Sequence, residues 1–424
     1  MSEKISLVDE KNNGQVKIWR WPKEGLTRIP DWVYTSDEIF KRERERIFFG
    51  PTWNFVALEA EIPKPGSYKR SYVGDVPVIV SRTAENAIHV FENRCAHRGL
   101  EFCRALRGEA KEFICPYHHW TYNMAGKLVS VPFRRGDKGK GGMPDHFEMS
   151  EHNPRQLKVE TRHGVVFATF EEKIESLEDY LGPENLEHFD VVFANRKLRI
   201  LGFYRNRLKG NWKLYHENLK DPYHATLLHV YLATFRMMVA GQKSAMIVDA
   251  TGRHATAASA KDDDIKINKE MVEEMKGAFR VGMDLNDPDF TRYVPEFDSP
   301  WTVTMQTIWP NLIVQRELNT LGIRHIVPRG PHELDMYWTM FGYEDDDEKM
   351  LRHRMKQGNL MGPSGYLGVD DNEAIRFLQD GFKRSISGEG IVMLDPDHEG
   401  STDTLISEAS IRSLYRHYRE VMDL

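Results

Sequence analysis

The sequence has few cysteines, no long apolar run and no excess of basic residues. Only three of its 424 residues are cysteine, which is too few for a disulfide framework. No segment approaches the roughly 20 consecutive apolar residues that span a bilayer, and the N-terminus has no apolar signal core. With 58 basic against 64 acidic residues, the net charge is −6, which gives no basic footprint for nucleic acid. These absences predict a cytoplasmic protein that binds neither membranes nor nucleic acid.

The length and the local patterns predict two domains. From about residue 50 to residue 170 the chain consists of short alternating or β-branched runs broken by turn residues, for example at 76–80 and 164–170. This pattern predicts a small all-β domain. Residues 1–49 and 171–424 are then expected to form a second domain.

The second domain combines helical and strand patterns. Residues 302–309, 312–318, 321–327 and 334–341 predict four strands of an antiparallel meander, which buries one face against helices. Apolar residues at helical spacing predict a terminal helix over 401–423. The whole chain is therefore expected to have an α+β fold.

All three cysteines lie between residues 95 and 115, and two of them are paired with histidines. Cys95-x-His97 and Cys115-x-x-His118 each follow a predicted strand, with seventeen residues between His97 and Cys115. Two such loops can direct four ligands at one metal centre. Cys103 has no such partner and is expected to be a plain thiol.

Two kinds of metal centre suit this ligand set. A Cys2His2 set could hold a structural zinc ion, but zinc fingers usually place both cysteines in one half of the motif. In a Rieske [2Fe–2S] cluster two thiolates hold one iron and two imidazoles hold the other. One cysteine and one histidine in each half favour the Rieske cluster over zinc.

A second candidate metal site lies in residues 211–229, a mostly helical segment with three histidines. His224 and His229, with a carboxylate from elsewhere, would form the facial triad that binds Fe(II) and leaves positions open. Five residues apart on a regular helix, the two side chains diverge by roughly 140°. Binding one ion would therefore need a wide turn such as a π-bulge. The alternative is that His224 and His229 are ordinary helical histidines that bind no metal. His216 is interpreted in this way too.

The two motifs together resemble the large (α) subunit of Rieske-type aromatic ring-hydroxylating oxygenases. The second motif is Asp221-x-x-His224, with His229 five residues later. The resemblance runs from about residue 53 to the C-terminus. It includes Asn-Trp-Lys-Leu at 211–214, Cys-Pro-Tyr-His-His-Trp at 115–120, and Gly-Pro-Ser-Gly at 362–365 followed by two aspartates at 370 and 371.

The resemblance implies a fold and a ligand set. The second domain would have a helix-grip (START-like) fold in which a large antiparallel sheet encloses a mononuclear iron. His224, His229 and Asp371 would bind this iron, with Asp370 as the neighbour most easily mistaken for the ligand. Without the resemblance, both aspartates would be interpreted as N-capping residues of the following helix.

The family also implies a route for electrons. An aspartate at the position of Asp221 joins a cluster histidine of one subunit to an iron ligand of the next, here His118 to His224. This arrangement requires a ring of at least three α chains, either a homotrimer or an α3β3 assembly with a small β subunit. Asn218 is expected near the iron, although it lies one residue nearer Asp221 than the asparagine of naphthalene-type members.

Residues 218–229 are similar to large subunits that act on aromatic carboxylates such as anthranilate, salicylate or terephthalate. Arg316 and Arg324 interrupt apolar strands of the meander, and an arginine in a pocket pairs bidentately with a carboxylate. The alternative for each arginine is a salt bridge at a surface or an interface.

The expected activity is that of a terminal oxygenase component that hydroxylates an aromatic carboxylate with O2, a dioxygenase rather than a monooxygenase. No glycine fingerprint for flavin or nicotinamide is evident, so electrons from NAD(P)H would arrive through a separate reductase or ferredoxin.

Three alternatives remain open at this stage. A Rieske electron carrier would lack the second iron site, and a zinc-stabilised binding protein would be colourless. An O-demethylase or other monooxygenase of the same family would use the same ligands and would differ in its product.

Overall fold

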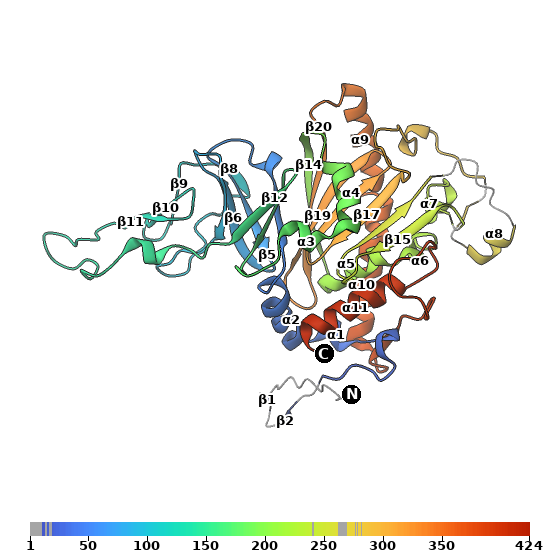
Figure 1. The fold of residues 1–424 in the computed structure, drawn as a ribbon, viewed down its shortest axis with the longest axis horizontal. Coiled ribbons are helices and arrows are strands. Elements are labelled where there is room, and N and C mark those ends of the chain that lie inside the picture. Colours follow the sequence, from blue (N-terminus) through green and yellow to red (C-terminus); the bar gives the residue numbers. More distant parts are fainter. Residues whose placement is uncertain are drawn as a thin grey trace. The chain divides into compact units, whose positions relative to one another are not determined.

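The chain forms two compact units in a computed structural model that describes residues 11–12, 15–16, 19–239, 241–261, 269–275, 277, 279–280 and 282–424 (Figure 1). The small unit is Phe48–Leu177. The large unit joins Met1–Ile47 to Glu178–Leu424. Residues 1–10 of the predicted second domain lie outside the described residues.

The small unit is built from β-strands, as expected. Its three sheets have the strand orders β7-β6-β5-β8, β11-β10-β9 and β12-β13-β4. The strands are β4 (Asn54–Leu58), β5 (Ser67–Val73), β6 (Val76–Arg82), β7 (Ile88–Glu92), β8 (Arg107–Glu109), β9 (Glu112–Ile114), β10 (Thr121–Asn123), β11 (Leu128–Ser130), β12 (Lys158–Arg162) and β13 (Val165–Thr169).

An aromatic core supports the cysteine-containing end of the small unit. Phe91, Phe113 and Tyr122 are buried in one cluster with Cys95 and Cys115. Aromatic side chains bury a large apolar area and have few rotatable bonds. They therefore give the two cysteines a rigid base.

A seven-stranded antiparallel sheet forms the centre of the large unit, in the order β14-β20-β19-β18-β17-β16-β15 (Figure 1). The predicted α+β class is confirmed, and the predicted meander forms four neighbouring strands of this sheet. The strands are β14 (Leu198–Leu208), β15 (Ser244–Val248), β16 (Ala255–Ser259), β17 (Val303–Ile308), β18 (Leu312–Glu317), β19 (Thr320–Pro328) and β20 (Leu334–Tyr343), with a separate pair β3 (Arg28–Pro30) and β21 (Glu389–Ile391).

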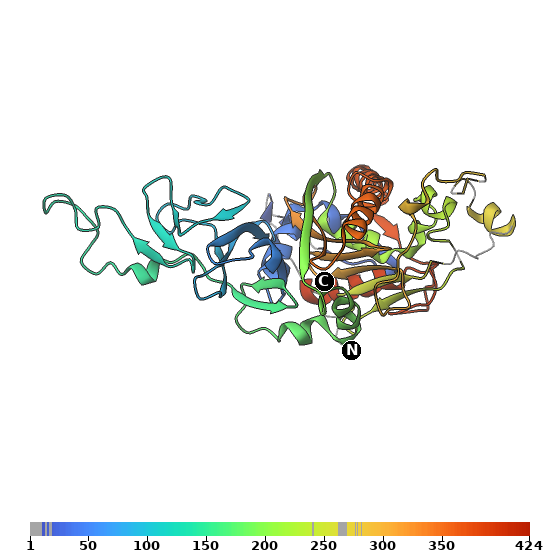
Figure 2. The same ribbon diagram turned by 90° about the horizontal axis from the view of Figure 1, so that it is seen from above.

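Helices cover both faces of this sheet, and Figure 2 shows α9, orange-brown and seen nearly end-on, on one side of it. The helices are α1 (Trp32–Thr35), α2 (Asp37–Glu43), α3 (Leu177–Leu181), α4 (Pro183–Phe193), α5 (Trp212–Lys220), α6 (Pro222–Ala225), α7 (Val230–Thr234), α8 (Lys269–Met275), α9 (Glu348–Met361), α10 (Tyr366–Arg384) and α11 (Ala409–Met422). None within the described residues has both the length and the apolar character needed to cross a membrane.

Neighbouring residues of β17 show which helix lies on which face. Lys220 of α5 donates to the Thr307 hydroxyl (2.5 Å), whereas Gln306 donates to the Asn185 carbonyl in α4 (2.7 Å). Successive side chains of a strand point to opposite faces. Helices α5 and α4 therefore pack on opposite faces, and the segment with the candidate iron ligands lies on the odd-numbered face of β17.

The terminal helix begins later than predicted. Helix α11 starts at Ala409, and the first residues of the predicted helix contact the sheet instead. The Ser401 hydroxyl accepts a hydrogen bond from the Val248 N–H (2.9 Å), and Thr402 forms a β-bridge with Met246. The backbone groups of Thr402 and the side chain of Ser401 are thus used by β15, so the chain is not helical there.

A buried glutamate joins three helices that are distant in sequence. Glu43 of α2 accepts hydrogen bonds from the Lys213 ammonium (2.6 Å), the Trp212 indole (2.8 Å) and the Tyr418 hydroxyl (2.6 Å). Burial lowers the pKa of Lys213, while the contact with Glu43 favours its charged form. Residues from both ends of the chain thereby fix the start of α5.

Replacing Glu43 with glutamine should destabilise the large unit, because Lys213 would remain buried without its counter-charge. A broken buried ion pair costs about 3–5 kcal/mol. Guanidinium denaturation followed by fluorescence would measure the loss. The matched control is Glu45→Gln, which removes the same charge at an exposed position of the same segment. Equal unfolding curves for the two variants would contradict the role assigned to Glu43.

Candidate functional site

The two cysteine loops of the small unit repeat one hydrogen-bond pattern. In each loop the cysteine N–H donates to the carbonyl five residues later, and the cysteine carbonyl accepts from the N–H four residues later, at 2.8–2.9 Å. The residue at the fourth position has a positive φ, +77° at Gly99 and +56° at His119. The two loops therefore have the same frame, although their histidines occupy different positions within it.

The four predicted cluster ligands come together at this end of the small unit. Cys95 and Cys115 are buried, His97 and His118 are exposed, and the two histidine Nδ1 atoms face each other at 3.1 Å. Burial raises the pKa of the Cys115 thiol, and the neighbouring Cys95 adds to this effect. Two cysteine sulfurs and two histidine nitrogens fit a [2Fe–2S] cluster in which the cysteines would hold one iron and the histidines the other.

A tyrosine contacts this ligand set directly. The Tyr122 hydroxyl donates to the Cys95 sulfur (3.3 Å) and accepts from the Ala96 N–H (3.0 Å). Hydrogen bonds to ligand sulfurs influence the reduction potential of iron–sulfur clusters. Its sequence position, seven residues after Cys115, gave no signal for this contact.

The histidines of the large unit lie around a break between two short helices. Asp221 caps α6 by accepting from the backbone N–H groups of Tyr223 and His224 (3.0 and 3.2 Å), and Pro222 occupies the first helical position. The chain leaves the helix after Ala225, and His229 immediately precedes α7. The expectation was a wide turn such as a π-bulge if both histidines bind one ion; the chain instead brings them together by interrupting the helix between α6 and α7.

Asp371 lies between these two histidines. Its Oδ1 is 3.6 Å from His224 Nε2 and 3.2 Å from His229 Nε2, and the three candidate ligand atoms lie within 4.8 Å of one another. Burial would raise the pKa of Asp371, but hydrogen bonds to both histidines hold it well below its usual range. Asp371 lies within α10 and is not an N-cap. Two imidazoles and one ionised carboxylate, converging in a buried place, fit a divalent iron ion.

Each histidine also has a carboxylate on its other ring nitrogen. Asp221 Oδ2 is 3.6 Å from His224 Nδ1, and Asp370 Oδ2 is 3.3 Å from His229 Nδ1. The Asp370 carboxylate can hold the proton on His229 Nδ1 and leave Nε2 free for a metal. Asp221, by contrast, lies beyond hydrogen-bond distance of His224 Nδ1 and acts as a nearby counter-charge. The sequence indicated Asp221 beside a ligand histidine by resemblance, but Asp370 entered only as the neighbour of the ligand.

Asn218 lies at the triad, whereas His216 does not. The amide nitrogen of Asn218 donates to Asp371 Oδ1 (3.1 Å) and lies 3.3 Å from His224 Nε2. His216 is buried elsewhere, with its Nε2 2.7 Å from the Pro310 carbonyl, and burial lowers its pKa to about 3. His216 is therefore a core residue, as its sequence context indicated.

A small, mainly apolar cavity adjoins the triad. Its volume is about 60 Å³. An apolar cavity of about 150 Å³ is known to hold benzene, so a ring enters this one only when side chains move. Methionine side chains adapt readily. The lining residues are Asn218, Leu219, Asp221, Pro222, His224, Ala225, His229, Leu232, Met238, Ala257, Ala258, Val303, Met305, Glu317, Leu367, Asp371 and Leu405.

The two predicted carboxylate-binding arginines lie on different faces of the sheet. Arg316 pairs in register with Thr304 and donates to its hydroxyl (3.2 Å) on the face that α4 covers. It does not line the cavity, which corrects the prediction for this residue. Arg324 lies on the same face as the triad and donates to the Tyr215 hydroxyl (2.9 Å). Its side chain is not among those that line the cavity.

Two family models match the chain. The model described as "Rieske [2Fe-2S] domain" matches residues 52–139, and the model described as "Ring hydroxylating alpha subunit (catalytic domain)" matches residues 190–424. The cofactors of these domains are a Rieske [2Fe–2S] cluster and a mononuclear non-haem iron that uses O2, as the sequence predicted. The matches favour an oxygenase over both an electron carrier and a zinc-stabilised binding protein.

Three curated relatives match almost the whole chain. The large oxygenase component of salicylate 5-hydroxylase from Ralstonia sp. is 45% identical over 95% of this chain and 96% of its own length. The large subunit of anthranilate 1,2-dioxygenase from Burkholderia cepacia is 40% identical over 95% of each chain. Terephthalate 1,2-dioxygenase, terminal oxygenase component subunit alpha 2, from Comamonas sp., is 36% identical over 96% of this chain and 98% of its own.

Solved structures share the fold. Naphthalene 1,2-dioxygenase from Rhodococcus sp. bound to indole aligns with a TM-score of 0.76 at 25% identity, covering 93% of this chain and 94% of that chain. A quaternary ammonium Rieske monooxygenase aligns with a TM-score of 0.73 at 19% identity, covering 96% and 99%. The second likeness concerns the fold alone.

Asp370→Asn should weaken iron binding at the triad by about 10- to 100-fold, because the amide no longer supports the Nδ1 proton of His229. Iron loss to a chelator, measured against chelator concentration, would report the affinity. Asp371→Ala is expected to lose this iron entirely while the cluster keeps two irons and two sulfides.

Asp380→Asn is the matched control, since it removes the same charge from a more exposed position of the same helix. A chelator curve for Asp370→Asn that coincides with the control would show that Asp370 does not support the ligand.

Proposed function

Because the chain belongs to the family of Rieske ring-hydroxylating oxygenase α subunits, we propose that it hydroxylates an aromatic carboxylate similar to anthranilate or salicylate. The observation that carries the proposal is the triad opening onto an apolar cavity. The relatives named above act on aromatic acids according to their names, which supports this substrate class.

Residues 50–170 form the proposed cluster domain, and residues 1–49 with 171–424 form the proposed iron domain. Cys95, His97, Cys115 and His118 would hold the [2Fe–2S] cluster, and His224, His229 and Asp371 would hold the iron. When bound, the cluster supplies single electrons and the iron supplies the site at which O2 and the ring meet.

The protein's own groups orient the reacting parts. Asp221 and Asp370 lie beside the two imidazoles, and Asn218 donates to the carboxylate between them. The apolar wall, which includes Leu232, Met238 and Met305, would hold the ring and exclude water. The role of the chain is thus to orient the reacting groups and to exclude water from them.

Arg324 remains the proposed partner of the substrate carboxylate. Its guanidinium lies over the Trp338 ring at 4.1 Å, and its Nη2 is buried without a hydrogen-bond partner among the described residues. Buried polar groups are normally hydrogen-bonded. A substrate carboxylate could accept a hydrogen bond from Arg324 Nη2 once methionine side chains of the cavity wall move.

We also propose that electrons enter the iron site from a neighbouring subunit. Asp221 and His224 line a cavity of about 280 Å³ in the large unit, bordered by apolar residues such as Leu378 and Ile391. His118 and Tyr117 are exposed in the small unit. A second copy could therefore place His118 against Asp221, which is the arrangement expected in a homotrimer or an α3β3 assembly.

The proposed partners follow from the electron requirement. A reductase that oxidises NAD(P)H, with or without a ferredoxin, would reduce the cluster, and a small β subunit would complete the assembly. A cytoplasmic location is part of the proposal.

The reconstituted system should hydroxylate salicylate or anthranilate. The assay combines the iron-loaded protein, a reductase, a ferredoxin and NADH, with the products identified by mass spectrometry under ¹⁸O2. One labelled oxygen per product indicates a monooxygenase, and two indicate a dioxygenase. Absence of labelled product from every aromatic acid tested would contradict the proposed function.

Asp221→Asn should block electron transfer without removing either metal centre. The amide cannot carry the negative charge that supports His224 and would bridge to His118. After chemical reduction of the cluster, stopped-flow absorbance should show no rapid reoxidation with substrate and O2. The surface variant Asp397→Asn should reoxidise normally. Normal reoxidation in Asp221→Asn would exclude this residue from the electron route.

A further inference from the structure

Glu317 is the one charged side chain that the central sheet contributes to the cavity, among the described lining residues. It is the last residue of β18, and its register partner on β17, Val303, also lines the cavity. The other sheet residues of the lining are apolar. A substrate ring resting on this wall would therefore meet a single carboxylate.

A short polar chain connects this carboxylate to Arg324. Gln315 donates to Glu317 Oε2, and its own Oε1 accepts from Arg324 Nε (3.4 Å). Gly322, the register partner of Gln315, has no side chain, which leaves room for this contact. Glu317 and Arg324 thus lie on one face of the sheet with Gln315 between them. Within the described part of the chain, no residue donates a hydrogen bond to the second carboxylate oxygen of Glu317, which can therefore accept one from a ligand.

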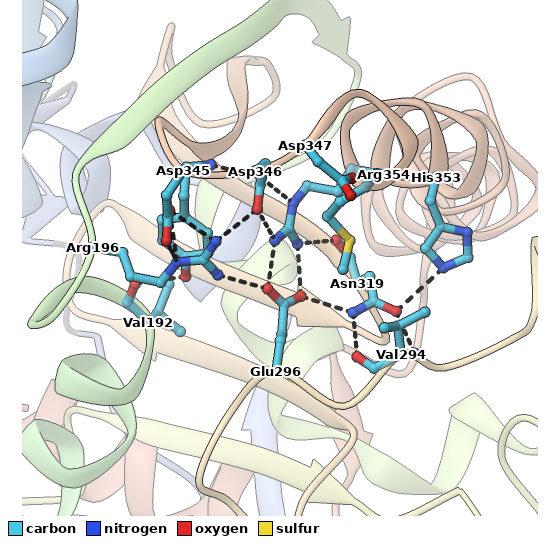
Figure 3. Close-up of polar contacts among 12 residues, drawn as sticks. Val192, Arg196, Val294, Glu296, Asn319, Asp345, Asp346, Asp347, His353 and Arg354 are labelled. Carbon is cyan, nitrogen blue, oxygen red and sulfur yellow. Dashed lines mark hydrogen bonds and ion pairs between the residues drawn. The ribbon is translucent and has the colours of Figure 1, made fainter.

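The turn after Glu317 is held rigidly by a buried polar network (Figure 3). Asn319 donates to Glu296 Oε1 (2.7 Å), and Arg354 donates to the Asn319 carbonyl and to Glu296 Oε1 (both 2.8 Å). Leu318 has a φ of +54°, a conformation that costs about 1–3 kcal/mol for a bulky residue unless its surroundings enforce it. The network therefore fixes the direction in which β18 presents Glu317.

We propose that Glu317 determines substrate specificity by accepting a hydrogen bond from a hydroxyl or amino group next to the carboxylate of the aromatic acid. The inference rests on the proposed function, and it narrows the substrate class to ortho-hydroxy and ortho-amino acids. Arg324 would receive the carboxylate, and Glu317 would receive the adjacent donor.

The position of Glu317, which lines the cavity and is connected to Arg324 through Gln315, supports this assignment. Burial raises its pKa, while the guanidinium of Arg324 acts in the opposite direction and favours the ionised form. A buried acceptor without a donor pays a desolvation cost, so an acid that lacks the ortho donor is disfavoured. A second ortho carboxylate would place two negative charges together in a medium of low dielectric constant. The site should therefore accept salicylate and anthranilate and reject benzoate and phthalate.

Calorimetric titration of the iron-loaded protein with these four acids tests the inference, together with product assays. Wild type should bind salicylate and anthranilate about 10- to 100-fold more tightly than benzoate, as expected for a hydrogen bond to a charged group. Glu317→Gln should lose most of this preference and bind phthalate more tightly than wild type does. Glu317→Asp, which keeps the charge, should retain part of the preference.

Glu348→Gln is the matched control, because it removes the same charge from an exposed helix position. Iron content and the cluster spectrum of each variant establish that both metal sites are intact. Affinity ratios in Glu317→Gln equal to those of the control would overturn the inference, as would a wild type that prefers benzoate or binds none of the acids. Preferential binding without hydroxylated product would instead contradict the proposed function and leave the role of Glu317 supported.

Discussion

A buried carboxylate between two imidazoles is the constraint on which the large unit depends. Asp371 is almost fully enclosed, and a buried charge of this kind is stable only when it is paired or binds a metal ion. The chain satisfies it by interrupting a helix at Pro222 and again before His229, and by packing α10 against α5. The buried hydrogen bonds of Glu43 to Trp212 and Lys213 fix the start of α5, the helix that leads to this break.

The charges around the triad affect what can bind beside it. Asp221, Asp370 and Asp371 supply three negative charges within reach of the two histidines. A divalent iron ion neutralises two of them, so the loaded site keeps an excess of negative charge. An aromatic acid approaching such a site is repelled unless a cation lies nearby. Arg324 is a buried cation on this face of the sheet, and its guanidinium lies over the Trp338 ring.

How much could be predicted from the sequence depended on the range of the interactions. The cysteine–histidine loops were predictable because each is a local turn with a fixed hydrogen-bond frame. The α+β class and the meander were predictable from alternation along the chain. Asp371 came from family resemblance alone, since no local pattern links α10 to His224. The start of α11 was missed because 401–402 pair with β15, a contact that no periodicity shows.

Arg316 shows most clearly what the sequence alone could not predict. Arg316 and Glu317 are neighbours on β18, so one of them must face the iron site and the other must face α4. An arginine within apolar residues suggested a pocket, but only the pairing of β17 with β18 decides the face, and it places Glu317 inward. A shift of one residue in that register would exchange the two side chains. The proposed substrate preference thus depends on strand register as much as on residue type.

A cavity wall in which Glu317 is linked to Arg324 would contribute to the selectivity of substrate binding more than to its affinity. A buried acid linked to a buried base gains little net binding energy, because the two groups already compensate each other before a ligand arrives. A ligand gains only if it matches both groups at once, with its acid toward Arg324 and its donor toward Glu317. A ligand with one of these features leaves the other, buried group without a partner. The rigid turn at Asn319 makes this cost unavoidable, because Glu317 cannot move away to meet solvent.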